Sequence, residues 1–147
     1  MDIERQIFLL NRLLANYFVL YIKLHRYLWY IKGEQSLSLL NWLKEKNTVC
    51  KQQIDHLVEL ILLLEGRPFA TMEKYIKEAT IEEASADDEI TEMIQQLIAD
   101  TTEMLNSINE LIEDELATEN RRVVEQTLSL LEYELLKIQQ ECKRFFK

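Results

Sequence analysis

Glycine and proline are scarce in this sequence, whose 147 residues include two glycines and one proline. Because these residues interrupt helices most strongly, their scarcity permits long, continuous helices. The sequence also contains no unbroken apolar run near the ~18 residues that a transmembrane helix needs. Its first residues, Met1 to Arg5, do not form a signal-peptide pattern. We therefore expect a cytoplasmic protein without a membrane segment.

Positive charge is also in short supply, since the formal net charge is −9. Such a surface repels nucleic-acid phosphates unless basic residues are concentrated in one place. The N-terminal region offers Arg5 and Arg12, and the C-terminus ends in the short run Lys143 to Lys147. Neither is a flexible, lysine-rich arm, so the charge pattern does not support DNA binding.

The sequence has two cysteines and two histidines. Cys50 and Cys142 have neither the spacing of metal ligands nor that of a disulfide framework. Both fall at apolar positions of predicted helices, which is typical of inert, buried thiols.

The histidines exclude one kind of iron site. A di-iron centre inside a single helical bundle needs Glu-x-x-His on two helices, because residues i and i+3 then project together. Ile22 stands three residues before His25, and Gln53 stands three before His56. We therefore expect no di-iron centre within one subunit.

The sequence is instead rich in apolar residues at helical spacing. Hydrophobic residues make up 48% of the chain, and they recur at alternating intervals of three and four, as on the buried side of a bundle helix. Four long helices are predicted: from Asp2, as N-cap, to Gly33; from Ser36 to Gly66; from about Asp87 to Leu111; and from Thr118, as N-cap, to Phe145. Their predicted core positions are Ile3, Ile7, Leu10, Leu14, Tyr17, Tyr21, Leu24, Leu28, Ile31, Cys50, Ile54, Leu57, Ile61, Leu64, Ile90, Ile94, Leu97, Thr101, Met104, Ile108, Leu111, Val124, Leu128, Leu131, Leu135, Ile138, Cys142 and Phe145.

The connections indicate the type of bundle. The first and third links are short, so each joins antiparallel neighbours. The segment from Glu65 to Ala86 is longer than the connections usual in compact domains, and Thr71 can cap a short helix within it that carries Met72, Tyr75 and Ile76 on one side. Short, long, short is the order of ferritin-like bundles, whereas cytokine bundles have two long crossovers. We predict one all-α domain over residues 1–147, a ferritin-like four-helix bundle with a short helix in its crossover.

The first two predicted helices and the crossover resemble one particular ferritin-like family, the Dps proteins, which are mini-ferritins of starved cells. The resemblance covers about residues 10–84, and beyond them it rests on pattern and length. It is carried by the segments Leu10 to Asn16, Leu20 to His25, Trp29 to Gly33, Ile54-Asp55 with Glu59, Gly66 to Met72, and Ala79 to Ala84.

The resemblance implies a hollow dodecamer that oxidises ferrous iron at sites shared by two-fold-related subunits. In that family, two histidines from the first two helices of one subunit face an aspartate and a glutamate from the second helix of its partner. The acidic residues match Asp55 and Glu59 here, whereas the histidine positions hold Leu28 and Leu40. Leucine cannot coordinate iron, so we expect the carboxylates to hold a divalent cation weakly and ferroxidase activity to be strongly impaired.

Neighbouring residues could act at such a site. His25 lies one turn before Leu28 on the same helix face, which makes it a candidate auxiliary ligand; the family often has a histidine there beside the ligand, which favours a packing or hydrogen-bonding role. His56 adjoins Asp55 but lies about 100° away around the helix. Trp29 matches a family tryptophan near the metal, although packing and interface roles are commoner for tryptophan.

Asp55 and Glu59 also have an ordinary interpretation as a solvated acidic face. Two acids at i, i+4 destabilise an exposed helix by only ~0.2–0.5 kcal/mol. Lys51 stands four residues before Asp55 and offsets part of that repulsion. Both interpretations remain open on the sequence alone.

The start of the fourth predicted helix departs from the family. Family members line an iron-entry pore with aspartates there, whereas the corresponding segment, Asn120 to Gln126, contains Arg121 and Arg122. Arginine at a cation entrance raises the barrier to Fe²⁺, while Glu119 and Glu125 supply some negative potential.

Two functions of one assembly follow from these residues. The first is a Dps-type shell that stores iron and protects against peroxide with weak oxidation chemistry, and the second is a structural or DNA-associated shell that has lost its iron chemistry. An unrelated helical interaction module is a third interpretation. A homododecamer is predicted because large apolar residues outside the main core positions need partner surfaces, namely Phe18, Trp29, Tyr30, Trp42, Phe69 and Phe146.

Overall fold

The computed structural model describes residues 3–31, 36–84, 89–114 and 120–145, and within these ranges the chain forms five helices and no strand. The predicted positions Asp2, Gly33, Asp87 and Thr118 lie outside the described residues. The helices are α1 (Ile3–Tyr30), α2 (Ser36–Leu63), α3 (Met72–Glu78), α4 (Ile90–Glu113) and α5 (Arg121–Phe145).

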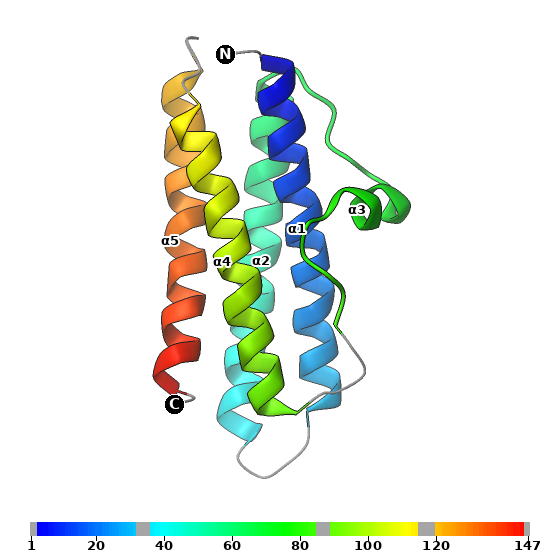
Figure 1. The fold of residues 1–147 in the computed structure, drawn as a ribbon, viewed down its shortest axis with the longest axis vertical. Helices are drawn as coiled ribbons and strands as arrows, with labels where there is room; N and C mark the ends of the chain where they lie inside the picture. Colours follow the sequence, from blue (N-terminus) through cyan, green and yellow to red (C-terminus); the bar gives the residue numbers. More distant parts are fainter. Residues whose placement is uncertain (1–2, 32–35, 85–88, 115–119, 146–147) are drawn as a thin grey trace.

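The four long helices lie side by side as two antiparallel pairs, α1 with α2 and α4 with α5 (Figure 1). Between the pairs the chain crosses over along the length of the bundle, on the side of α1, so that α2 and α4 run in the same direction. The short helix α3 lies within this crossover and packs against α1. The predicted four-helix bundle with one long crossover is confirmed.

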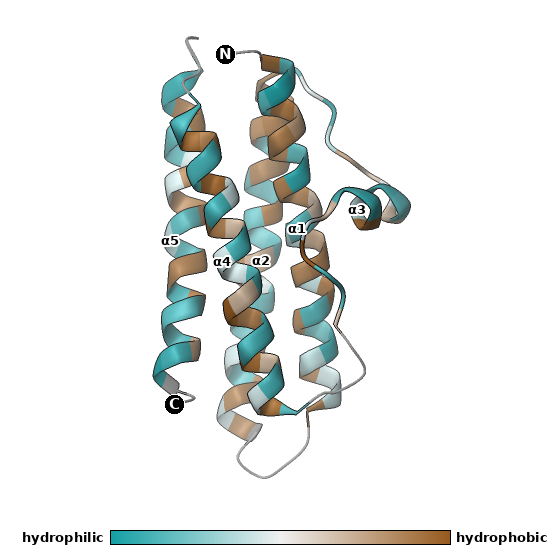
Figure 2. Cartoon of the chain, viewed as in Figure 1, coloured by the Kyte–Doolittle hydropathy of each residue, from teal (hydrophilic) through white to brown (hydrophobic). Residues whose placement is uncertain are grey.

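The core lies where the apolar spacing places it. Hydrophobic and hydrophilic residues alternate along each long helix (Figure 2), as expected for helices with one buried face. On α2 the predicted core residues are all buried, on α5 so are those from Val124 to Cys142, and on α4 all except the half-buried Ile90. The side chain of Phe145 lies outside the described residues. On α1, the half-buried exceptions are Ile3, Ile7, Tyr21 and Leu28, and Ile31, just after the helix, is also half-buried.

Two helices begin later than the sequence indicated. α4 begins at Ile90, after Glu89, whose side chain forms no capping hydrogen bond. α5 begins at Arg121, and the carbonyl of Asn120 accepts the amide of Val124 at 3.0 Å. Apolar spacing locates the buried face of a helix better than its ends, because the ends depend on how a few terminal amides are satisfied.

The end of α2 is a Schellman turn with an unusual residue in its left-handed position. The amide of Gly66 donates to the carbonyl of Ile61 at 2.8 Å, and the amide of Glu65 donates to that of Leu62 at 2.9 Å. Glu65, and not the glycine, has the positive φ of 63°. Gly66 is needed for space, because a Cβ there would lie 2.7 Å from Cγ2 of Ile7.

Polar side chains of α1 fasten the crossover to the bundle. The side-chain amide of Asn11 donates to the carbonyl of Arg67 at 3.0 Å and accepts the amide of Phe69 at 2.9 Å. Asn16, fully buried, accepts the amides of Thr80 and Ile81 at 2.7 and 3.1 Å. These bonds satisfy backbone groups that no regular structure satisfies.

Lys23 makes the third attachment and adds an ion pair. Its ammonium donates to the carbonyl of Glu82 at 2.8 Å and lies 2.6 Å from Oδ2 of Asp100 on α4. A second buried lysine, Lys46 of α2, lies 2.6 Å from Oε1 of Glu141 on α5. Each pair joins two helices that belong to different antiparallel pairs.

The short helix α3 is held at its start and on its inner side. The hydroxyl of Thr71 accepts the amide of Lys74 at 3.2 Å, so the predicted cap is confirmed. Tyr75 is buried, stacks on Phe18 of α1 with ring centroids 4.1 Å apart, and donates its hydroxyl proton to the carbonyl of Phe69. The helix is thereby fixed against the middle of α1.

By length and composition alone, α1 is apolar enough to cross a membrane, and it is the one such helix among the described residues. However, 61% of its apolar window is buried inside the bundle. The sequence prediction considered only unbroken apolar runs. The mean hydropathy of this helix is high although polar residues interrupt its apolar ones. A single helix of this kind is weak support for a membrane span, because the core helix of a bundle has the same composition.

Candidate metal site

The two acids of the predicted site lie on an exposed face of α2, one helical turn apart. Asp55 and Glu59 are both exposed. The ammonium of Lys51, one turn earlier, lies 2.8 Å from Oδ1 and 2.9 Å from Oδ2 of Asp55. The hydrogen bond to Asp55 is the main reason that the pKa of Lys51 is raised. Asp55 is therefore already paired with a cation of its own helix.

The two leucines at the family's histidine positions are half-buried. Leu28, near the end of α1, packs against the core, and Leu40 lies in the second turn of α2. Leu40 and Asp55 are separated by 15 residues of one continuous helix, which corresponds to about 22 Å at ~1.5 Å per residue. A single copy therefore cannot bring these two positions to one metal.

His25 is held in a defined orientation on α1. Its Nδ1 lies 2.8 Å from the carbonyl oxygen of Tyr21; because a carbonyl only accepts, Nδ1 carries the proton and Nε2 of the neutral ring carries the lone pair. The ring lies edge-on between Tyr21 and Trp29, at centroid distances of 4.5 and 5.3 Å. The expected packing and hydrogen-bonding contacts are thus present, and Nε2 is the atom that could bind a metal.

The described residues of one copy contain no group of three histidine, cysteine, aspartate or glutamate side chains that could hold a metal ion. His56, next to Asp55, is exposed. A complete site would require groups from a second copy, in agreement with what the resemblance implies. The Asp55–Lys51 contact and the leucines do not match a donor set of histidines and carboxylates.

The large apolar residues expected to need a partner divide into two groups. Phe18, Trp42 and Phe69 are half-buried and pack against this chain's own core. A partner surface is therefore not needed to explain these three residues. Trp29 is 70% exposed and Tyr30 is 49% exposed. Phe146 lies outside the described residues. The sequence could not separate the groups, because the crossover that covers Phe18 has no periodic pattern.

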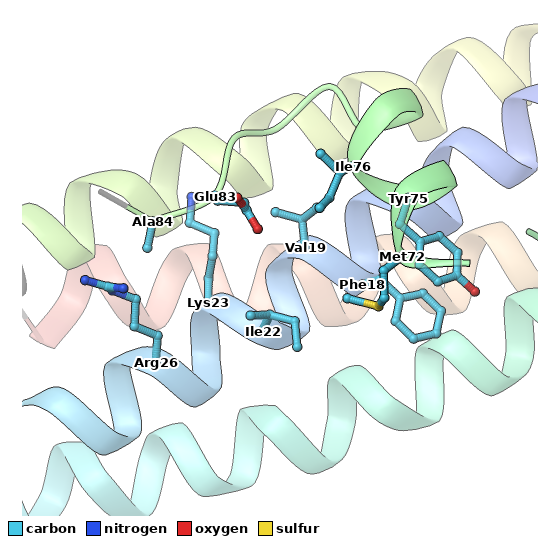
Figure 3. Close-up of a pocket in the computed structure, with 10 residues that line it drawn as sticks. All are labelled: Phe18, Val19, Ile22, Lys23, Arg26, Met72, Tyr75, Ile76, Glu83 and Ala84. Carbon is cyan, nitrogen blue, oxygen red and sulfur yellow. The ribbon is translucent and has the colours of Figure 1, made fainter. Parts of the chain in front are cut away.

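A small cavity lies between α1 and α3, with a volume of about 170 Å³. Side chains of the two helices face each other across it (Figure 3), and Ile22, Met72 and Ile76 are about half exposed at its edge. Its lining contains neither the acids of α2 nor His25. The cavity is therefore separate from the candidate metal site.

The cysteines are buried, as predicted. The thiol of Cys50 donates to the carbonyl of Tyr17 at 3.6 Å, and burial raises its pKa. Burial is also the main reason that the pKa of Cys142 is raised to about 12. Neither thiol is positioned to act as a ligand or nucleophile, because both remain protonated at neutral pH.

The arginines at the start of α5 are exposed. Nε of Arg121 lies 3.0 Å from Oε1 of Glu125, so one of the expected negative groups is paired with an arginine. Glu119 lies outside the described residues. This segment therefore presents Arg122 alongside an ion pair.

Comparison with known proteins identifies the family to which the chain belongs. The family model of the ferritin-like domain matches residues 7–147, and the chain therefore belongs to the ferritin-like proteins. Among curated proteins, general stress protein 20U of Bacillus subtilis is 35% identical over 99 residues, covering 67% of this chain and 68% of that protein. The DNA protection during starvation protein of Brevibacillus brevis is 34% identical over 100 residues, covering 68% and 67%.

Solved structures agree with this assignment. A crystal structure of a Dps protein from Bacillus brevis has a TM-score of 0.91 and 28% identity and covers 100% of both chains. The Dps protein of Vibrio cholerae O1, described as a ferritin-like diiron-carboxylate protein, has a TM-score of 0.90 and 28% identity and covers 99% of this chain and 91% of its own. Within the ferritin-like proteins, this chain is a member of the Dps family.

Proposed function

We propose that this chain is a cytoplasmic Dps-type subunit that forms a hollow homododecamer, binds and stores iron and protects against oxidative stress, with a weak site for iron oxidation. The proposal treats residues 1–147 as one ferritin-like domain. The observation that carries it is the pair Asp55 and Glu59, which keeps the family's acidic positions on an exposed face of α2.

The assembly is supported by the exposed side chains of the α1–α3 side. Trp29, Tyr30, Met72 and Ile76 are each about half exposed or more, and large apolar side chains of this kind would be covered in an assembly. Light scattering should find particles of twelve chains of 17.6 kDa each. A monomer at micromolar concentration would rule the shell out.

The weakness of the site is supported by Leu28 and Leu40, which offer no donor atom. Mixing the protein anaerobically with Fe²⁺ and then adding air or peroxide should give oxidation close to the protein-free control. A Leu28→His plus Leu40→His variant should be faster. A fast wild-type reaction that Asp55→Ala abolishes would show that the leucines are not limiting.

A shell without ferroxidase activity is the second candidate, favoured by the contact between Lys51 and both carboxylate oxygens of Asp55. Such a shell could be structural or protect DNA. The net charge of −9 argues against DNA binding at physiological salt. A gel shift that persists at ~150 mM salt would reverse this preference.

A further inference from the structure

The Lys51–Asp55 contact joins one ammonium to both oxygens of one carboxylate. Its ammonium reaches both oxygens of the carboxylate within 2.9 Å. In another i, i+4 pair of the described chain, that of Lys74 and Glu78, the closest approach is 3.9 Å. Lys51 therefore lies where a divalent cation bound by both oxygens of Asp55 would lie.

The surroundings of Asp55 fit an ammonium better than a transition metal. Two carboxylates and water form a weak, hard donor set, and no third acidic or histidine side chain of the described chain converges on them. An ammonium needs no coordination geometry, because it is a point charge with rotatable donors. One positive charge supplied by the chain also halves the negative charge of the Asp55–Glu59 pair.

We propose that Lys51 is a built-in cation that takes the place of a metal at Asp55 and competes with divalent ions for this face. In that case Asp55 is a member of an ion pair, and only Glu59 remains available to a metal. Replacing the two leucines by histidine would then repair only part of the site. Removing the ammonium as well would be needed for tight binding.

Mn²⁺ is a suitable probe, because it prefers oxygen ligands and its free concentration can be read from its electron paramagnetic resonance signal. Lys51→Ala should bind Mn²⁺ about two- to fivefold more tightly than the wild type, the range that an exposed ion pair of this kind can contribute. Lys51→Arg, which keeps the charge, should show no gain. Adding Asp55→Asn to Lys51→Ala should abolish the gain.

Lys74→Ala is the control, since it removes one ammonium from another i, i+4 pair, whose glutamate is 16% exposed, and changes the net charge equally. A gain in Lys51→Ala no larger than in Lys74→Ala would overturn the inference. Equal Mn²⁺ affinity in every variant would also overturn the inference, and so would the absence of Mn²⁺ binding in every variant. Lys51 and Lys74 are both solvent-accessible, so circular dichroism should show the same fold in each.

The inference deepens the proposed function, because it concerns the same carboxylates, but its Mn²⁺ test measures neither assembly nor iron oxidation. Unchanged Mn²⁺ affinity in Lys51→Ala would refute the built-in cation and leave the shell intact. A monomeric wild type would refute the shell and leave the competition at Asp55 intact. As a second readout, Lys51→Ala added to the Leu28→His plus Leu40→His variant should oxidise iron faster than the two histidines alone.

Discussion

Removing the ammonium of Lys23 should destabilise the protein far more than removing both members of its ion pair. The side chains of Lys23 and Asp100 are only 4% and 11% exposed, and their charged atoms are 2.6 Å apart. Lys23→Met leaves the carboxylate of Asp100 buried without a partner, which costs about 3–5 kcal/mol. In Lys23→Met plus Asp100→Leu, no buried charge remains at this position, and the main loss is the hydrogen bond to the carbonyl of Glu82, about 1 kcal/mol.

The loss of stability caused by Lys23→Met should be smaller at lower pH. Burial raises the pKa of Asp100 above its usual value, although Lys23 opposes the shift. Lys23→Met removes that opposition, so the pKa of Asp100 in the folded variant rises further. A folded-state pKa above the unfolded value gives stability that is complete at low pH and is lost as the pH rises through the raised pKa. The loss of unfolding free energy in Lys23→Met should therefore become smaller as the pH is lowered from 7 toward the ordinary pKa of an aspartate.

Urea unfolding at pH 7 and at pH 5, followed by circular dichroism at one protein concentration, measures both effects. The double variant should lie within about 2 kcal/mol of the wild type and show no such pH dependence. If its loss equals the sum of the losses of the single variants, the two groups are not coupled and the reasoning fails. A Lys23→Met deficit that is the same at both pH values would refute the buried-carboxylate explanation.

Two further predictions concern the crossover. Asn16→Ala should lower the free energy of unfolding by about 2–4 kcal/mol, because the amides of Thr80 and Ile81 lose their acceptor; limited proteolysis should cut this variant first near residue 80, and an uncut crossover would count against the attachment. Glu65→Gly should raise the free energy of unfolding by about 0.5–1 kcal/mol, because φ at this position is 63°; a lower melting temperature would show that the glutamate side chain stabilises the turn.

The long helices and their buried faces could be predicted from the sequence because each depends on local periodicity. Leu10, Leu57, Leu97 and Leu131, one on each long helix, are buried as the spacing indicates. The helix starts were less predictable, as α5 shows. The helix begins at Arg121, whereas the predicted cap, Thr118, lies outside the described residues; several residues near a helix start can serve as the cap.

The polar interior could not be predicted, because it depends on which helices become neighbours. Lys46 has no sequence signal that separates it from the exposed Lys44, yet its side chain is fully buried. Its partner, Glu141, lies 95 residues further along the chain. For the candidate site, the sequence identified Asp55, Glu59 and the neighbouring Lys51, but not the contact of Lys51 with both oxygens of Asp55.

Many of the residues that carry the family resemblance attach the crossover to α1. The fold can therefore be kept even if the chemistry at the candidate metal site is lost. Asn11 binds the segment that follows Gly66, Asn16 binds the segment at Thr80, and Lys23 binds the next residues along. Each attachment thus joins two of the segments that resemble Dps proteins. None of them involves Leu28 or Leu40. A chain can therefore keep all three attachments, and with them the bundle, while positions 28 and 40 change, so the resemblance along α1 supports the fold and says little about iron oxidation.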